Sequence, residues 1–113
     1  MSHDDTKVDP SELLKGMYRD GYFPDDVVDK VRDVILEACH EIEAEGPSDH
    51  QALYAITCRA TDKINDLQSV FEERGSEIET VARDDIAVTF GYVAKTYGFE
   101  DADLEKLIAT REW

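Results

Sequence analysis

Residues 76–97 carry apolar side chains around most of the circumference that a helix would have. At about 100° per residue, only a narrow strip of such a helix is polar, and it runs through Glu77, Asp84, Gly91 and Lys95. A helix that is apolar on nearly every side must be covered by other elements. We therefore predict an all-α bundle with this helix at its centre.

Four further helices are predicted from apolar spacing and from residues that begin or end helices. Gly46 and Pro47 give the strongest break in the chain, and they separate two long helices. The predicted fold is a compact bundle of about five helices, three long and two short, formed by residues 10–113 as one domain after a mobile polar arm, residues 1–9. The predicted helices cover about residues 11–19, 24–45, 48–75, 76–97 and 102–110.

The stretch MYRDGYFPDDVVDK, residues 17–30, joins the first two helices. Pro24 suits the first position of a helix, where its missing N–H costs nothing. That placement puts Tyr22 just before the cap and Val27 at the fourth position, so the two side chains would form a hydrophobic staple with Tyr22 buried. The alternative is an exposed aromatic wedge that docks a partner.

Two serines have the spacing of capping boxes, in which a Ser hydroxyl and a side chain three residues later satisfy free backbone N–H groups. Ser48 with Gln51 would open the third helix, and Ser76 with Glu79 would open the fourth.

The chain has 113 residues and a net charge of −15, from 27 acidic and 12 basic side chains spread along its length. This charge repels nucleic acid and anionic lipid, because both require Lys and Arg for binding. We expect no nucleic-acid partner and no membrane partner, and a basic protein is the compatible macromolecular partner. Solvated surface is the simpler explanation of the charge.

Cys39 and Cys58 are the only cysteines, and neither belongs to a CxxC or zinc-spaced motif. Two such thiols are typical of a reduced cytosolic protein. The first ten residues contain no hydrophobic signal segment, and no run is long enough to span a membrane. The sequence thus predicts a cytoplasmic protein, and it does not indicate the oligomeric state.

Four segments of the chain form a pattern of helix joints and core positions, and they are MYRDGYFP, VVDKVRDVILEACHEIE, EIETVARDDIAVTFGYVAKTYGF and DADLEKLIATREW. On these segments the chain resembles a family of small bacterial proteins whose function is unassigned. The resemblance covers residues 13–113 and implies the helical fold, but it transfers no catalytic residue.

An acidic ridge is the first candidate site. Its members follow at four-residue spacing in a stretch without Lys or Arg, and they are Asp33, Glu37, Glu41 and Glu45. Neighbouring like charges on a helix repel by about 0.2–0.5 kcal/mol per pair. A cation from another helix, a basic partner, or solvation alone could offset this repulsion. Reversing Glu37 and Glu41 to lysine would turn repulsive steps into attractive ones, so we expect this change to make the isolated protein slightly more stable at low salt.

A polar line is the second candidate, on one flank of the fourth helix, and it consists of Asp85, Thr89, Tyr92 and Thr96. Buried polar groups require hydrogen-bond partners. The line therefore predicts either a structural network between helices, with Arg59 or Arg83 near the carboxylate, or a small-molecule pocket.

Glu37 and His40 have the E-x-x-H spacing of carboxylate-bridged di-metal bundles, but the sequence contains one such motif where two are needed. We predict no metal and no cofactor. The sequence has no G-x-S-x-G, no phosphate-binding glycine loop, no H-E-x-x-H and no EF-hand loop. We interpret it as a non-enzymatic protein-interaction module, for instance an inhibitor or neutraliser of a basic partner. The alternative function is a small-molecule or metal binder that uses the polar line.

Overall fold

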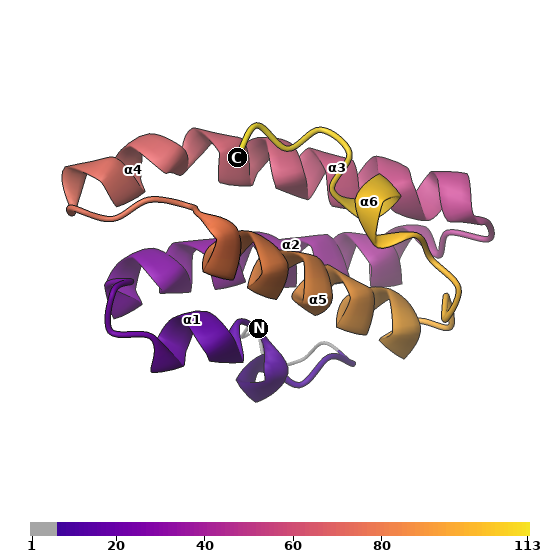
Figure 1. The fold of residues 1–113 in the computed structure, drawn as a ribbon. Coiled ribbons are helices and arrows are strands. Elements are labelled where there is room, and N and C mark those ends of the chain that lie inside the picture. Colours follow the sequence, from indigo (N-terminus) through magenta and orange to yellow (C-terminus); the bar gives the residue numbers. More distant parts are fainter. Residues whose placement is uncertain (1–6) are drawn as a thin grey trace.

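The structure is a computed structural model that describes residues 7–113, and it confirms the all-α class (Figure 1). No strand occurs among the described residues. Three helices are long and the others are short, as predicted. The elements are the 3-10 turn η2 (Pro10–Glu12), α1 (Lys15–Arg19), α2 (Asp25–Glu45), α3 (His50–Asp66), α4 (Gln68–Glu73), α5 (Thr80–Thr96) and α6 (Leu104–Leu107).

The long helices form the body of the bundle. α2 packs along α3, and α5 crosses in front of α2 in the view of Figure 1. α1 packs against α5 and α2, while α6 packs against α5 and α3. One apolar core joins these helices, and its largest fully buried side chains include Phe71 and Phe90.

α5 has the predicted buried face but is not enclosed on every side. Ala82, Ile86, Phe90 and Val93 are buried in the core. On the opposite face, Val88 is 61% exposed and Val81 is 45% exposed, as two of the most exposed large apolar side chains described. The expectation of a central helix therefore holds for one face only, because the other helices cover α5 from one side.

The third predicted helix is interrupted at Leu67 and continues as the separate α4. Asn65 and Asp66 precede the break, and both are poor residues for a helix interior because their side chains compete for backbone groups. The carbonyl of Asn65 accepts from the Gln68 side chain, and that of Asp66 accepts from the Ser69 hydroxyl. The continuous 48–75 helix was a wrong prediction for this reason.

Phe23, not Tyr22, is the buried aromatic residue at the joint between α1 and α2. Phe23 is 2% exposed and Tyr22 is 42% exposed, with the two rings edge to face at 5.0 Å. Pro24 is the N-cap of α2, so the helix begins one residue later than predicted. The staple positions therefore fall on Phe23 and Val28, both of them buried. The prediction of a buried Tyr22 was wrong by this one-residue shift.

Neither predicted capping box forms. Asp49 caps α3 by accepting from the backbone N–H of Ala52 at 2.8 Å, so the helix begins one residue after the position expected from Ser48. α5 begins only at Thr80, and Glu79 at its N-cap makes no side-chain cap hydrogen bond. Ser76 is instead buried in the loop between α4 and α5.

Residues 7–9 of the predicted arm pack against the bundle. Val8 is 1% exposed, and the backbone N–H of Lys7 donates to Glu43 Oε2 at 2.7 Å. The packed chain thus begins before residue 10. The remainder of the predicted arm, residues 1–6, lies outside the described residues.

Candidate functional site

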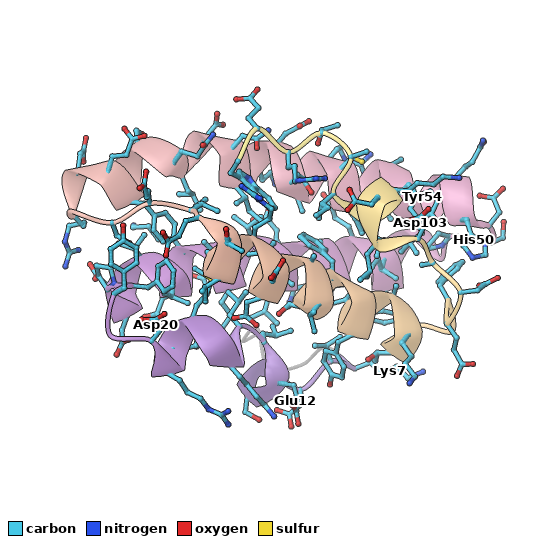
Figure 2. The ribbon with its side chains drawn as sticks, viewed as in Figure 1. Lys7, Glu12, Asp20, His50, Tyr54 and Asp103 are labelled. Carbon is cyan, nitrogen blue, oxygen red and sulfur yellow. The ribbon has the colours of Figure 1, made fainter. Side chains whose placement is uncertain are left out.

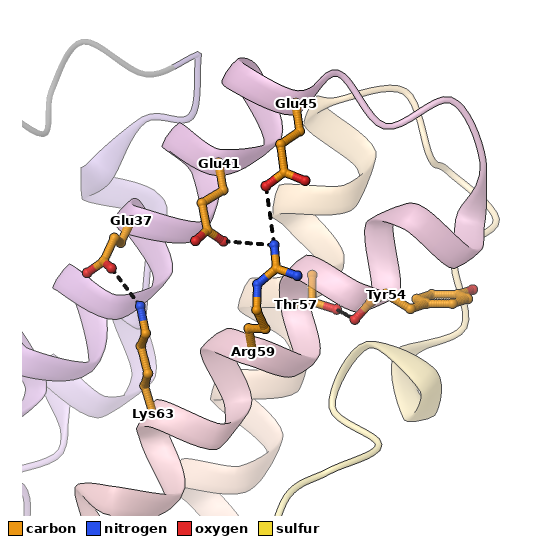
Figure 3. Close-up of polar contacts among 7 residues, drawn as sticks. All are labelled: Glu37, Glu41, Glu45, Tyr54, Thr57, Arg59 and Lys63. Carbon is orange, nitrogen blue, oxygen red and sulfur yellow. Dashed lines mark hydrogen bonds and ion pairs between the residues drawn. The ribbon is translucent and has the colours of Figure 1, made fainter.

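Three members of the acidic ridge on α2 reach cations on α3 (Figure 3). Lys63 Nζ lies 2.6 Å from Glu37 Oε1. Arg59 Nη2 lies 3.2 Å from Glu45 Oε2 and 3.7 Å from Glu41 Oε2. Of the explanations that the sequence left open, the structure thus shows a cation from a neighbouring helix.

These ion pairs are open to water. The side chains of Glu37 and Lys63 are 57% and 48% exposed, and that of Arg59 is 51% exposed. Exposed ion pairs contribute at most about 1 kcal/mol, since water and salt screen them. The carboxylates are therefore held weakly and remain accessible to the cations of another molecule.

The same surface carries carboxylates that have no cation. Within residues 7–113, Asp33 is in no ion pair, and neither are Asp62 and Asp66 on α3. Helical spacing places Asp62 and Asp66 on the side of α3 that bears Arg59 and Lys63. We call this region the acidic α2–α3 surface, and it has six carboxylates against two cations: Asp33, Glu37, Glu41, Glu45, Asp62 and Asp66 with Arg59 and Lys63.

The polar line on α5 binds the backbone of the segment that leads into α1. Asp85 Oδ2 accepts from the N–H of Met17 at 2.8 Å, and Thr89 Oγ1 accepts from the N–H of Leu14 at 3.2 Å. The Tyr92 hydroxyl accepts from the N–H of Asp9 at 3.3 Å. The fourth member, Thr96, donates to the carbonyl of Tyr92 within α5.

Asp85 acts as the cap of α1 from a different helix. The residue at the N-cap position is Leu14, which has a left-handed backbone (φ 57°) and no side chain able to accept a hydrogen bond. Burial raises the pKa of Asp85, while hydrogen bonds from the N–H groups of Met17 and Gly16 oppose this shift. The partners expected for the carboxylate, Arg59 or Arg83, are thus replaced by free backbone donors of α1.

A second polar line, on α3, was missed in the sequence and holds the C-terminal segment. The Tyr54 hydroxyl accepts from the N–H of Asp103 at 3.0 Å. The Thr61 hydroxyl donates to the carbonyl of Thr57 at 2.9 Å and lies 3.5 Å from the carbonyl of Leu107. Asn65 donates to the carbonyl of Thr110 and accepts from the N–H of Glu112. The signal was present, because Tyr54, Thr61 and Asn65 recur at helical spacing on α3.

His50 joins the start of α3 to the loop after α5 (Figure 2). Its Nε2 lies 2.9 Å from Asp101 Oδ1, and its ring packs edge to face against Phe99 at 5.4 Å. The hydrogen bond from His50 holds the pKa of Asp101 below its usual value. This contact is exposed and supports the attachment of the loop.

Cys39 lies against a hydrogen-bonded pair of side chains. The Tyr97 hydroxyl donates to Glu43 Oε2 at 2.5 Å, and this bond lowers the pKa of Glu43. Burial, with a smaller contribution from Glu43, raises the pKa of the Cys39 thiol to about 12. A thiol in this state is a poor nucleophile near neutral pH, because the thiolate is the reactive form.

The E-x-x-H pair is not assembled into a larger group. Glu37 binds Lys63, and His40 is half-buried near Glu43 on the same helix. Among residues 7–113, no three His, Cys, Asp or Glu side chains are grouped so as to hold a metal ion.

Together these features define a small acidic all-α bundle whose open surface of like charge lies on α2 and α3. The chain belongs to the family of unknown function DUF5713, whose model matches residues 7–113. No curated protein and no solved structure is detectably similar to it. Over the part of the chain that the structure describes, no helix is long and apolar enough to cross a membrane.

Proposed function

We propose that the protein is a non-enzymatic interaction module that binds a basic protein through the acidic α2–α3 surface. The observation that carries the proposal is the excess of six carboxylates over two cations on one face of two packed helices. Complementary charge raises the rate of encounter and selects partners of opposite sign. A basic partner would therefore be captured selectively.

Binding would exchange weak intramolecular pairs for intermolecular ones. Arg59 and Lys63 are about half exposed in their pairs with α2. A partner's Arg could form bidentate hydrogen bonds with Glu41 or Glu45, which are stronger than the long contact of 3.7 Å between Arg59 and Glu41. The role that fits this chemistry is inhibition or neutralisation of the basic partner.

The polar line on α5 gives less support to a small-molecule pocket. Asp85, Thr89 and Tyr92 already accept hydrogen bonds from backbone N–H groups. A ligand there would have to replace these bonds. The proposal also places the protein in the cytoplasm, in keeping with two free thiols, one of them buried.

Affinity capture from a native bacterial lysate at low and high salt tests the proposed function. We expect the immobilised protein to retain one or a few basic proteins at low salt and to release them as salt rises. Retention that does not depend on salt, or retention of acidic and basic proteins alike, would contradict the proposal.

A further inference from the structure

The outward face of α5 carries apolar side chains that no other described element covers. Val88 and Val81 are 61% and 45% exposed, and they lie two turns apart on one side of the helix. In Figure 1 α5 runs across the front of the molecule with no helix in front of it. Leu104 of α6 is also 41% exposed.

The residues of this face have the spacing of a helix-pairing seam. Successive positions are separated alternately by three and by four residues, as are the contact positions of coiled coils. These positions are Val81, Asp84, Val88, Gly91 and Lys95. Leu104 lies over Gly91, since a Cβ added to Gly91 would be 2.7 Å from Leu104 Cδ2. The centre of the seam is therefore an aliphatic ridge at Val88 beside a small residue flanked by Leu104.

The charge within α1 and α5 differs from that within α2 and α3. Together α1 and α5 carry four cations and two carboxylates, Lys15, Arg19, Arg83 and Lys95 against Asp84 and Asp85. One of the carboxylates, Asp85, is used in capping α1. Within their own bounds, α1 and α5 thus carry less negative charge than α2 and α3, although Glu12 pairs with Lys15 and Glu79 adjoins the start of α5.

We infer that α5 is a self-association surface, which pairs with α5 of a second copy in antiparallel orientation. A two-fold axis between Thr89 and Phe90 places Asp84 of each copy opposite Lys95 of the other. The same axis brings Val88 of each copy toward Gly91 of the other, where Leu104 covers the helix, so that Val88 would meet the Leu104 side chain. The seam is thus complementary to itself, as an isologous dimer interface requires.

A second copy gives Asp84 and Lys95 partners of opposite charge, because the two residues lie at equal distances on either side of the two-fold axis. The interface is one pair of helices with few apolar residues, so we expect a weak dimer with a dissociation constant in the micromolar range. This surface is on different helices from the acidic α2–α3 surface. Self-association therefore goes beyond the proposed function and does not depend on it.

Sedimentation velocity and light scattering on the full chain, over a range from low to high micromolar protein, test this inference. We expect the mass to rise toward twice the monomer value. Val88→Gln should remain monomeric over the same range. Ala55→Gln, at an exposed position on α3, is the matched control and should associate as the wild type does.

Charge exchange tests the antiparallel register itself. Asp84→Lys and Lys95→Asp should each weaken the dimer at least tenfold, because each places like charges opposite one another twice. The double variant restores opposite charges and should recover most of the affinity. All of these positions are exposed or partly exposed, and circular dichroism verifies the fold of each variant. A monomeric wild type, a dimer unaffected by Val88→Gln, or a double variant no better than the single ones would each overturn the inference.

Discussion

Asp85 and Gly16 come into close contact where α5 meets the first turn of α1. A Cβ added to Gly16 would be 3.2 Å from Asp85 Cγ. Asp85→Ala leaves the N–H of Met17 without its acceptor, and we expect it to lower the free energy of unfolding by about 1–2 kcal/mol. Asp85→Asn retains an oxygen acceptor and should lower the free energy of unfolding by a smaller amount. Denaturant titration of both variants gives the comparison.

The substitution Gly16→Ala distinguishes the effect of a better helix former in α1 from the effect of steric contact with Asp85. In the Asp85→Ala background, alanine should stabilise α1 by up to about 1 kcal/mol, since glycine is the weaker helix former. In the wild type this gain should be reduced or reversed, because the new methyl group displaces the carboxylate. Equal effects of Gly16→Ala in the two backgrounds would show that the close contact has no energetic consequence.

The raised pKa of Asp85 predicts how its contribution changes with pH. Because the pKa of Asp85 in the folded protein lies above its ordinary value of 3.8, the folded protein binds more protons than the unfolded chain in the interval between the two pKa values. Protonation of this group then stabilises the fold as pH falls through that interval. We expect the stability of the wild type relative to Asp85→Asn to increase from neutral pH toward pH 3.8. A relative stability that decreases over this range would indicate a lowered pKa.

The two thiols should differ in reactivity. Cys39 is fully buried and its pKa is raised to about 12, whereas Cys58 is partly exposed. At neutral pH we expect one thiol per chain to react readily with a thiol reagent, and the second to react only on unfolding. Cys58→Ser should remove the fast phase. A fast phase that persists in Cys58→Ser would mean that Cys39 becomes accessible in the folded protein.

The sequence predicted elements whose signals are local. The end of α2 at Glu45 follows from Gly46, which adopts the left-handed conformation (φ 56°) that favours glycine. The break at Leu67 was not predicted, although Asn65 and Asp66 give a local signal for it. The exchange of Tyr22 for Phe23 was not predicted either, since it depends on a one-residue shift in the start of α2. Apolar spacing does not resolve such shifts.

The environment of the candidate residues depends on how the helices are aligned with one another. Spacing identified Asp85 and Thr89 as a polar line, but their partners are backbone groups of residues 14–17. Likewise, the ridge was identified on α2, whereas Arg59 and Lys63 come into reach only because α2 and α3 are packed side by side. Neither alignment leaves a periodic signal in the sequence.

The ion pairs between α2 and α3 reverse the change in stability that the sequence predicted for charge substitutions on the acidic ridge. Lysine at 37 and 41 would face Lys63 and Arg59, so Glu37→Lys with Glu41→Lys should destabilise the isolated protein at low salt. We expect the free energy of unfolding to fall by roughly 0.5 kcal/mol, since exposed ion pairs are weak. Adding Arg59→Glu and Lys63→Glu should restore stability, and thermal melts at low and high salt measure it. Stabilisation by the first two substitutions alone would contradict the observed pairing.

Binding of a captured basic protein to two charge-matched variants tests the proposed function most directly. Asp62→Lys with Asp66→Lys changes the acidic α2–α3 surface without breaking its ion pairs, while Glu77→Lys with Glu100→Lys makes the same change in net charge elsewhere, at exposed positions. Calorimetric titration compares their dissociation constants with that of the wild type. We expect at least a tenfold loss of affinity for the first variant and near wild-type affinity for the second. Equal losses in both variants would show that only the total charge matters, and would contradict a defined binding surface on α2 and α3.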